Sequence, residues 1–512
     1  MAENERLKVG RLSDLADGSA TTVKVGENDV LLVRRGASVY ACGNNCPHYG
    51  GPLNEGTFKA DTVTCPWHNA TFRFTDGALT IPPALDDLPT YDVTVHGDEI
   101  FVGKVREPTI RMPEGHDGRS ILVVGAGAAG NACAEALRRY GFAGRITLIT
   151  HETDRPYDRP MLTKGFISGE AQEDWLYLRK EEFYRSLQIS VRTGAAVESF
   201  NPSTRSVKLS DGSTLTGDMV LLASGSRPRT VEIPGAERAG VFTLRSAADA
   251  RRIRAAAKTA KSAVIVGAGF IGMELASDLA QAKLAVHLVA PETEPMMAQF
   301  GQLIGARIRR IHESHGVAFH LGRTVREISG GTAAMRVELS DGTSLPVDIV
   351  ILALGALPET AYLKDTPALL ENGAVVVDKR LRTRADGVFA AGDIALVPYG
   401  AAGRFRIEHW VSSEAQGRHA AAAMLGGPAP FELIPFFWTR QYDGSIKYLG
   451  FPGTAERIAY RGDPDNGAFL AGFYRGDHLF GAATVGMSSE LLSLENAIRG
   501  SHNLPFERFP GG

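Results

Sequence analysis

Two short segments of the chain combine a cysteine with a histidine. Cys46 and His48 stand in Cys-Pro-His, and after 16 further residues Cys65 and His68 stand in Cys-Pro-Trp-His. Two such loops can hold a [2Fe–2S] cluster, with thiolates on one iron and neutral imidazoles on the other. Zinc is the competing interpretation, because two cysteines and two histidines suit a tetrahedral site. Zinc fingers usually pair cysteine with cysteine and histidine with histidine, whereas each segment here mixes them, so the iron–sulfur cluster is favoured.

Two glycine-rich turns further along the chain each follow an apolar segment. Gly-Ala-Gly-Ala-Ala-Gly occupies 125–130, and Gly-Ala-Gly-Phe-Ile-Gly occupies 267–272. Glycines in this pattern allow a tight turn after a strand, and the following helix directs its N-terminus at a pyrophosphate. Strand and helix signals flank both turns, so the sequence predicts two dinucleotide sites. The second helix is expected to pack on a sheet through Ile271, Leu275, Leu279 and Ala282.

The region of these turns also repeats itself. Residues 207–228 and 337–358 are identical at twelve of 22 positions, and each copy holds an Asp-Gly turn, at 211–212 and 341–342. Each copy predicts a β-hairpin that leads into a buried strand. Two related α/β units are therefore expected in this chain.

Acidic residues near the ends of predicted strands bear on the choice of nucleotide. The strand after the first turn ends near Glu152, the candidate ribose acceptor, although His151 could be the aligned residue instead. The strand after the second turn ends at Ala290, where an acid would favour NAD, and Glu292 and Glu294 follow without a nearby Arg or Lys. A 2′-phosphate would find no obvious cation, so NADH is favoured over NADPH.

Composition and charge exclude several classes of partner. The 512 residues include 55 Lys and Arg against 58 Asp and Glu, a net charge of −3, so nucleic acid is not an expected partner. The longest apolar runs fall far short of the ~20 residues that span a bilayer, so no membrane partner is expected. The N-terminus resembles neither a secretory signal nor a transit peptide, and only four cysteines occur, so we expect a cytoplasmic location.

Shifts in pattern along the chain predict a multidomain fold. We expect an all-β domain, two Rossmann-like α/β dinucleotide-binding domains and a small α+β C-terminal domain. The expected boundaries are 1–105 for the all-β domain, 106–119 for a linker, 120–235 with 357–428 for the first dinucleotide domain, 236–356 for the second, and 429–512 for the C-terminal domain.

The cysteine–histidine region resembles the Rieske-type ferredoxins over about 100 residues, through the motifs at 46–53 and 65–72. Respiratory Rieske proteins carry two further cysteines that bridge the loops, and Gly51 and Trp67 stand in those places here. The resemblance therefore implies a soluble, lower-potential cluster held by Cys46, His48, Cys65 and His68. Cys42, outside the motif, and Cys133, on an apolar helix face, are interpreted as packed core residues.

Residues 120–512 resemble the two-dinucleotide flavoprotein reductases, specifically the ferredoxin reductases of oxygenase systems and the apoptosis-inducing-factor-like oxidoreductases. Besides the two turns, the segments 156–164 and 383–393 carry this resemblance. It implies FAD contacts at Gly125, Gly127, Ala129, Gly130, Glu152, Arg159, Lys164, Val197, Arg245, Asp393, Trp410 and Trp438. It implies NADH contacts at Gly267, Gly269, Phe270, Ile271, Gly272, Glu274 and Gly355, with Lys164 and Glu274 as the catalytic pair. Arg159 could instead be a solvated charge, and Trp410 and Trp438 could be core residues.

One departure from related enzymes narrows the expected reaction. Many flavoprotein disulfide reductases of this fold carry a Cys-x₄-Cys pair, whereas only Cys133 follows Cys65 here, which excludes dithiol chemistry. The expected cargo is electrons, which would pass from NADH through FAD to the cluster and on to an external acceptor, such as a Rieske oxygenase. The alternative is an NADH-responsive redox sensor of the apoptosis-inducing-factor-like type. Either a monomer or a homodimer is compatible with both of these functions.

Overall fold

The computed structural model describes residues 6–331, 334–500 and 504–509. By its internal contacts the chain divides into two compact units, Met1–Arg111 and Met112–Gly512. Among the described residues, no helix combines the length and the apolar character needed to cross a bilayer.

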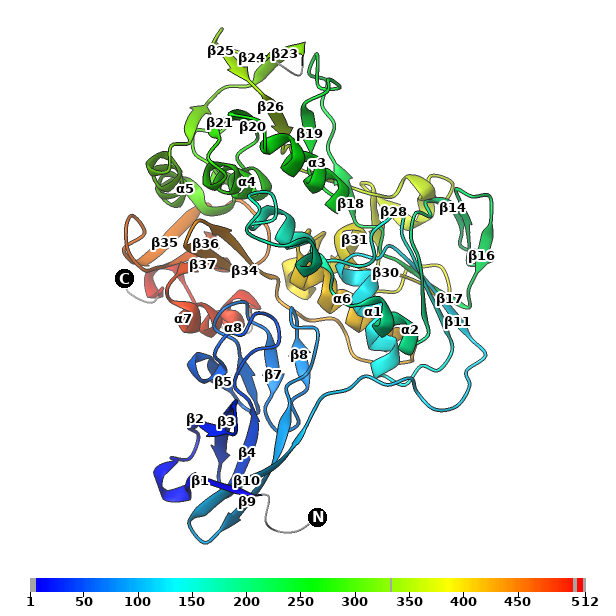
Figure 1. The fold of residues 1–512 in the computed structure, drawn as a ribbon, viewed down its shortest axis with the longest axis vertical. Helices are drawn as coiled ribbons and strands as arrows, with labels where there is room; N and C mark the ends of the chain where they lie inside the picture. The colour runs from blue at the N-terminus through cyan, green and yellow to red at the C-terminus, as the bar shows by residue number, and fades with distance from the viewer. Residues whose placement is uncertain (1–5, 332–333, 501–503, 510–512) are drawn as a thin grey trace. The chain divides into compact units, whose positions relative to one another are not determined.

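The first unit consists of two antiparallel sheets (Figure 1). The larger has the order β1 (Leu7–Arg11), β10 (Glu99–Arg106), β9 (Thr90–His96), β4 (Ser38–Gly43), β3 (Asn28–Arg35) and β2 (Ala20–Val25). The smaller contains β5 (Thr57–Lys59), β6 (Thr62–Thr64), β7 (Thr71–Arg73) and β8 (Leu79–Ile81). The two Cys–His segments occupy the loop after β4 and the turn between β6 and β7.

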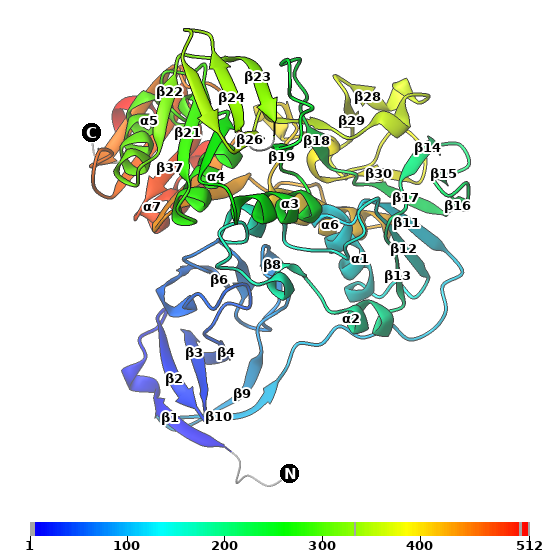
Figure 2. The ribbon, with the colours of Figure 1, turned by 45° about the horizontal axis from the view of Figure 1, so that its top comes forward.

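The second unit begins with a five-stranded parallel sheet. Its order is β13 (Ile189–Arg192), β12 (Arg145–Ile149), β11 (Ser120–Val124), β17 (Met219–Leu222) and β30 (Val388–Ala390). Helix α1 (Ala128–Arg139) packs alongside α6 (Trp410–Met424), as both ribbon views show (Figure 1, Figure 2). A small meander of β14 (Val197–Asn201), β15 (Ser206–Leu209) and β16 (Thr214–Thr216) precedes the buried strand β17.

A second parallel sheet repeats this plan. Its order is β19 (Val241–Thr243), β26 (Ile349–Leu352), β20 (Ser262–Val266), β21 (Ala285–Ala290) and β22 (Ala318–Leu321). The helices are α3 (Ala247–Ala257), α4 (Phe270–Gln281) and α5 (Met297–Ser314), and the meander is β23 (Val325–Gly331), β24 (Ala334–Leu339) and β25 (Ser344–Val347). Both Asp-Gly turns close a hairpin that leads into a buried strand, which confirms the prediction from the internal repeat.

The prediction for the face of α4 is partly wrong. Leu275 and Leu279 are fully buried, as expected, but the side chain of Ile271 is 41% exposed. Helix α4 starts at Phe270, so Ile271 belongs to its first turn, at the glycine-rich end of the strand rather than over the sheet. Ala282 follows the last helical residue and is only half-buried.

The C-terminal domain is a five-stranded antiparallel sheet with two short helices. Its strands are β33 (Phe436–Gln441), β34 (Gly444–Gly450), β37 (His478–Val485), β36 (Phe469–Arg475) and β35 (Arg457–Gly462), and its helices are α7 (Ser488–Ser493) and α8 (Glu495–Ile498). Tyr448, Phe469 and Phe473 share a hydrophobic core with the second parallel sheet and with α4 and α5. The sequence predicted β34, β36 and β37 but not β33, which contributes directly to the site below.

The remaining elements connect these domains. Strand β18 (Ser226–Pro228) pairs antiparallel with β27 (Ala356–Pro358), so the two crossings between the sheets run side by side. Helix α2 (Glu181–Ser186) precedes β13, and a four-stranded sheet has the order β28 (Leu370–Glu371), β29 (Ala374–Val376), β31 (Ala395–Pro398) and β32 (Arg404–Phe405).

Candidate functional site

The two Cys–His loops are built alike. In the first, the amide of Cys46 donates to the carbonyl of Gly51 (2.9 Å) and the amide of Gly50 to the carbonyl of Cys46 (2.8 Å). In the second, Cys65 donates to Ala70 (2.8 Å) and Asn69 to Cys65 (3.2 Å). Gly50 and Asn69, each four residues after the cysteine, both adopt positive φ, 78° and 61°. This closes each loop tightly enough to bring its cysteine and histidine to one site.

In the site, the two cysteines lie together and the two histidines lie together. Cys46 and Cys65 are each 2% exposed and share a thiol–thiol hydrogen bond, and the Nδ1 atoms of His48 and His68 lie 3.1 Å apart. Burial and then the neighbouring His68 lower the pKa of His48 to about 3, so its imidazole is neutral, as a metal ligand must be. Among the described residues, no group of three or more His, Cys, Asp or Glu side chains is arranged around one metal ion. A sulfur pair beside a nitrogen pair suits a two-iron cluster.

Gly51 occupies a position where a side chain would collide with the cluster loops. A Cβ atom there would lie 2.8 Å from the Cys65 sulfur and 3.1 Å from the Trp67 ring. Cys42 and Cys133 are fully buried and are not part of the site, which confirms their interpretation as core residues. Burial raises the pKa of Cys42 to about 12, so its thiol stays protonated at neutral pH.

In the second unit, a cavity of about 1280 Å³ joins the two glycine-rich turns. It exceeds the roughly 300–1,000 Å³ of an ordinary ligand pocket, which suits two ligands that meet. Most of the predicted contacts line it: Gly125, Gly127, Ala129, Glu152, Arg159, Lys164, Val197, Arg245, Gly269, Phe270, Ile271, Glu274, Gly355, Asp393, Trp410 and Trp438. Trp410 and Trp438 are half-buried at its wall, and Trp438 also packs against the core of the C-terminal domain.

Three predicted contacts, Gly130, Gly267 and Gly272, do not line the cavity. A Cβ on Gly130 would lie 1.8 Å from the carbonyl oxygen of Gly125, and one on Gly272 would lie 2.0 Å from that of Gly267. Gly267 has φ +111° and would meet Ala353 at 2.3 Å. The close approach of helix and strand requires Gly130 and Gly272, and the tight turn with its positive φ requires Gly267. Their contact with a bound dinucleotide stays a prediction.

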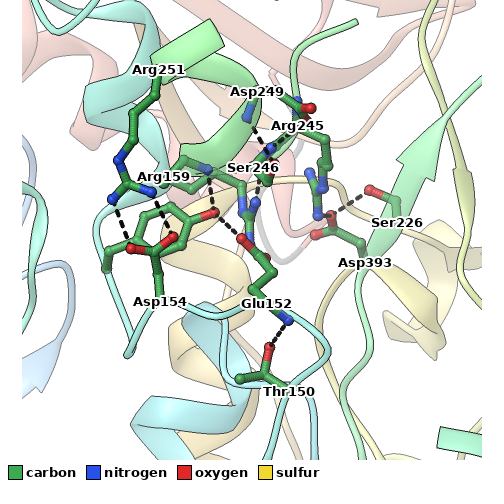
Figure 3. Close-up of polar contacts among 12 residues, drawn as sticks. Thr150, Glu152, Asp154, Arg159, Ser226, Arg245, Ser246, Asp249, Arg251 and Asp393 are labelled. Atoms are coloured by element: carbon green, nitrogen blue, oxygen red, sulfur yellow. Dashed lines mark hydrogen bonds and ion pairs between the residues drawn. The ribbon is translucent and has the colours of Figure 1, made fainter. Parts of the chain in front are cut away.

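A network of charged side chains surrounds the first turn's end of the cavity (Figure 3). Glu152 accepts from Arg159 (2.7 Å) and from the Tyr157 hydroxyl (2.6 Å), and the Tyr157 oxygen accepts from the backbone amide of Ala247 at the start of α3 (3.1 Å). Arg159 also donates to the carbonyl of Arg245. Arg159 is therefore paired and largely buried, not a solvated charge.

Asp393 forms the second acidic centre of this network (Figure 3). It accepts from Arg245 at 3.0 Å and from Ser226 at 2.9 Å. Burial opposes ionisation of Asp393, but Arg245 and Ser226 outweigh burial and lower its pKa. Burial likewise opposes ionisation of Glu152, and Arg159 outweighs it, so the pKa of Glu152 is lowered as well.

Where the two halves of the cavity meet, three domains converge on one carboxylate. Glu274 of α4 accepts from Lys164 (2.8 Å) and Thr163 (2.5 Å) on one oxygen, and from Thr439 of β33 (2.8 Å) on the other. The Glu274 and Lys164 side chains are 7% and 19% exposed. A buried ion pair of this kind holds both charges in fixed positions at the cavity wall.

Sequence reasoning missed four residues of the site: Tyr157, Thr163, Thr439 and His409. Tyr157 and Thr163 lie inside the segment 156–164 that drew attention for its cations, but neither carries a signal of its own. His409 precedes α6 and lines the cavity, and its Nδ1 has no hydrogen-bond partner among the described residues. Burial, then Lys164, lowers the pKa of His409 to about 3, so the ring is neutral.

At the end of β21, two described arginines lie near the expected ribose site, and both are paired with carboxylates. The fold does bring arginines there, which the sequence did not predict: Arg309 reaches Glu294 (2.9 Å), and the amide of Arg323 donates to the carbonyl of Ala290 (3.1 Å). The guanidinium of Arg323 pairs with Asp341 at 2.7 Å. Both side chains already have carboxylate partners, which agrees with the preference for NADH.

Two glycine turns around one cavity, together with a cysteine–histidine cluster site, define an electron-transferring flavoprotein reductase. The model of the pyridine nucleotide-disulphide oxidoreductase family matches residues 119–417, the Rieske [2Fe–2S] domain matches 5–92, and the reductase C-terminal domain matches 436–509. The chain therefore belongs to the pyridine nucleotide-disulphide oxidoreductase family. It is an FAD-dependent oxidoreductase that uses NADH and carries a Rieske cluster, and its multidomain architecture is as predicted.

Known relatives cover the chain in two ways. Human apoptosis-inducing factor 3 is 34% identical over 96% of this chain and 84% of its own length. The ferredoxin–NAD(+) reductase component of the anthranilate 1,2-dioxygenase system of Burkholderia cepacia is 32% identical over 72% of this chain and 91% of its own. A ferredoxin reductase from Rhodopseudomonas palustris superposes with a TM-score of 0.72 at 27% identity, over 76% of this chain and 96% of that one.

Proposed function

We propose that the chain oxidises NADH and delivers the electrons to its own Rieske cluster, from which they leave to an external acceptor such as an oxygenase component. One observation carries the proposal: a single chain holds both the cavity that joins two dinucleotide turns and the complete Cys46/His48/Cys65/His68 ligand set. Bound FAD supplies the conversion between the two-electron hydride and the one-electron cluster. The names of several relatives, which are reductase components of dioxygenase systems, support this acceptor class.

In this proposal the two halves of the cavity hold different ligands. The segments 120–235 and 357–428 hold FAD, through the Gly125–Gly127 turn and the network around Glu152 and Asp393. The segment 236–356 holds NADH, through Gly269, Phe270, Ile271 and Gly355. The segment 429–512 closes the cavity with Trp438, and its Thr439 donates to the Glu274 carboxylate from behind the cavity wall.

The Lys164–Glu274 pair acts where the two ligands meet. Because its charges are fixed before a ligand arrives, the pair can orient the nicotinamide without reorganising. His409, neutral and beside Lys164, adds a nitrogen with no protein partner among the described residues. It can accept a hydrogen bond from a bound ligand without adding charge.

Separating the two halves of the electron path tests the proposal. Cys46→Ser removes one cluster ligand and leaves the cavity untouched, and Cys42→Ala is the matched control because Cys42 packs in the same core. We expect Cys46→Ser to keep NADH-driven flavin reduction and to lose reduction of an external one-electron acceptor. The Cys42→Ala variant should keep both. Equal acceptor reduction by the two variants would contradict the proposal, and slow reoxidation with a long-lived reduced state would indicate a redox sensor instead.

A further inference from the structure

A line of buried polar side chains leads from the cavity to the surface of the C-terminal domain. It starts at Glu274, continues through Thr439 and Gln441 of β33 to His312 of α5, and ends at Tyr442. The first four residues are 6%, 1%, 8% and 0% exposed, and Tyr442 is half-buried. Polar groups this deep are costly unless they satisfy one another, and each of these has a partner in the line.

The hydrogen bonds of this line share one direction. Thr439 Oγ1 donates to Glu274 Oε1 (2.8 Å), so its oxygen is free to accept from Gln441 Nε2 (3.2 Å). Gln441 Oε1 then faces His312 Nε2 (3.4 Å), which must carry the ring proton. His312 Nδ1 is left to accept from the Tyr442 hydroxyl at 3.5 Å. Every donor therefore points toward the Glu274 carboxylate.

Hydrogen bonds that all point the same way polarise one another and stabilise the negative charge of the Glu274 carboxylate at the end of the line. Each bond strengthens the next, because a group that accepts becomes a better donor, and the effect is largest for the 2.8 and 3.2 Å bonds nearest Glu274. Neutral His312 is a condition for this arrangement, since Nδ1 must accept. Burial, only partly offset by Gln441, lowers the pKa of His312 to about 4, so the ring is neutral near pH 7.

Helix α4 holds both ends of the line. Ser277, one turn after Glu274, accepts from the backbone amide of Tyr442 at 2.9 Å. Tyr442 has φ 53°, a left-handed conformation that is unfavourable for a bulky residue. Its ring stacks on His315 at 3.7 Å, so the strained backbone places the hydroxyl beside His312. The two-residue turn between β33 and β34 requires this conformation, and it fixes the position of the Tyr442 side chain.

We propose that Thr439, Gln441, His312 and Tyr442 are positioning residues that hold the Glu274 carboxylate against Lys164 for reaction with NADH. The inference rests on the role of Glu274 in the proposed function. It assigns to the C-terminal domain a part in the NADH half-reaction, separate from any contact with an electron acceptor.

Two substitutions of Thr439 distinguish the effect of its hydroxyl from the effect of its side-chain shape. Thr439→Val keeps the shape and removes the donor, whereas Thr439→Ser keeps the donor. In anaerobic stopped-flow experiments with the whole chain, we expect Thr439→Val to slow flavin reduction at saturating NADH by about tenfold, with little change in NADH affinity. Thr439→Ser should stay within about twofold of the parent.

The matched control is Thr484→Val in β37 of the same domain. Thr484 is fully buried, and its hydroxyl donates to the Phe469 carbonyl at 2.6 Å, outside the line. We expect this variant to lose stability without slowing the NADH step. Equal rates in Thr439→Val and Thr439→Ser would overturn the proposal, as would equal slowing in Thr484→Val.

The protonated nitrogen of His312 gives a readout that does not depend on turnover. Nitrogen-15 NMR of histidine-labelled protein, with the His312 signal assigned by its loss in His312→Gln, should show a neutral ring protonated at Nε2. A ring protonated at Nδ1 would reverse the line and overturn the inference. If Glu274→Gln leaves the NADH step unchanged, the assigned role of Glu274 fails. The acceptor assay with Cys46→Ser tests the electron path independently of both results.

Discussion

The two dinucleotide halves of the second unit share a backbone plan down to single hydrogen bonds. In the first, Ser120 donates through its amide and hydroxyl to Asp218, at 2.7 and 3.0 Å. In the second, Ser262 donates in the same way to Asp348, at 2.9 and 3.1 Å. In both, a third glycine packs its helix onto the carbonyl of the first glycine. The halves therefore differ in their side chains rather than in their framework.

The difference lies at the cavity. The first half is closed by paired charges around Glu152 and Asp393, whereas the second half presents Ile271, 41% exposed, in the first turn of α4. We attribute the first to resident FAD and the second to transient NADH.

The largest expected effect is on stability, and it comes from the third glycine of each turn, which lets the helix pack closely on the strand in both halves. Gly130→Ala and Gly272→Ala each place a Cβ within 2.0 Å of a backbone carbonyl, and backbone cannot move aside as a side chain can. We expect each variant to lose about 3 kcal/mol of unfolding free energy. Denaturant titration and soluble yield measure this. A stable Gly272→Ala beside an unstable Gly130→Ala would show that the two turns are not equivalent.

The glycines that face the cavity should separate the halves. A Cβ on Gly127 or on Gly269 meets no protein atom within 4 Å, so both alanine variants should fold. We expect Gly127→Ala to weaken FAD binding by about tenfold or more, and Gly269→Ala to keep FAD and weaken NADH binding to a similar extent. Flavin content and NADH titration measure the two. Loss of FAD in Gly269→Ala would contradict the assignment of the halves.

Tyr157 tests whether the network of the first half holds FAD. Tyr157→Phe keeps the ring and removes the bonds to Glu152 and to the Ala247 amide. We expect about fivefold weaker FAD binding, measured by flavin fluorescence. Tyr184→Phe is the control, because it loses an equally buried bond, to Asn131 at 2.9 Å, away from the cavity. The same loss in both variants would indicate a general effect on stability.

The smallest expected effect is a difference between the two halves in their response to acid, which is not seen at neutral pH. Glu152 and Asp393 have lowered pKa values, so their stabilisation is present above the unfolded pKa of about 4 and is lost as the pH falls through their folded pKa. In the second half, burial raises the pKa of Asp278, so its cost to folding appears as the pH rises and is absent in acid. Acid should therefore release FAD before the second half unfolds. A flatter pH profile of FAD release in Asp393→Asn checks the cause, and an unchanged profile would rule out Asp393.

The sequence predicted most of what is local. The cysteine–histidine motifs, the glycine turns and the Asp-Gly hairpins each depend on residues close together in the chain, and the structure builds them as expected. The sequence missed β1, β5, β7 and β8. The last three have only three residues each, too few to show an alternating pattern, and β6, which is equally short, was predicted only as part of the β-rich run 62–65. Whether the predicted contact residues bind FAD and NADH stays a prediction.

What could not be predicted arises from contacts between distant segments. Thr439 reaches Glu274 across 165 positions, and Ala247 reaches the Tyr157 hydroxyl across 90. Neither a threonine in a strand nor a backbone amide carries a signal of its function. Ile271 and the third glycines were assigned by pattern alone, and the pattern does not distinguish a glycine that touches a ligand from one that lets a helix approach.

The most direct test of the account is electron paramagnetic resonance of the purified protein, reduced anaerobically with NADH alone. The account predicts a rhombic Rieske-type signal that is absent in Cys46→Ser and present in Cys42→Ala. Bleached flavin without that signal, in protein that contains iron, would show that this flavin does not feed the cluster and would contradict the account.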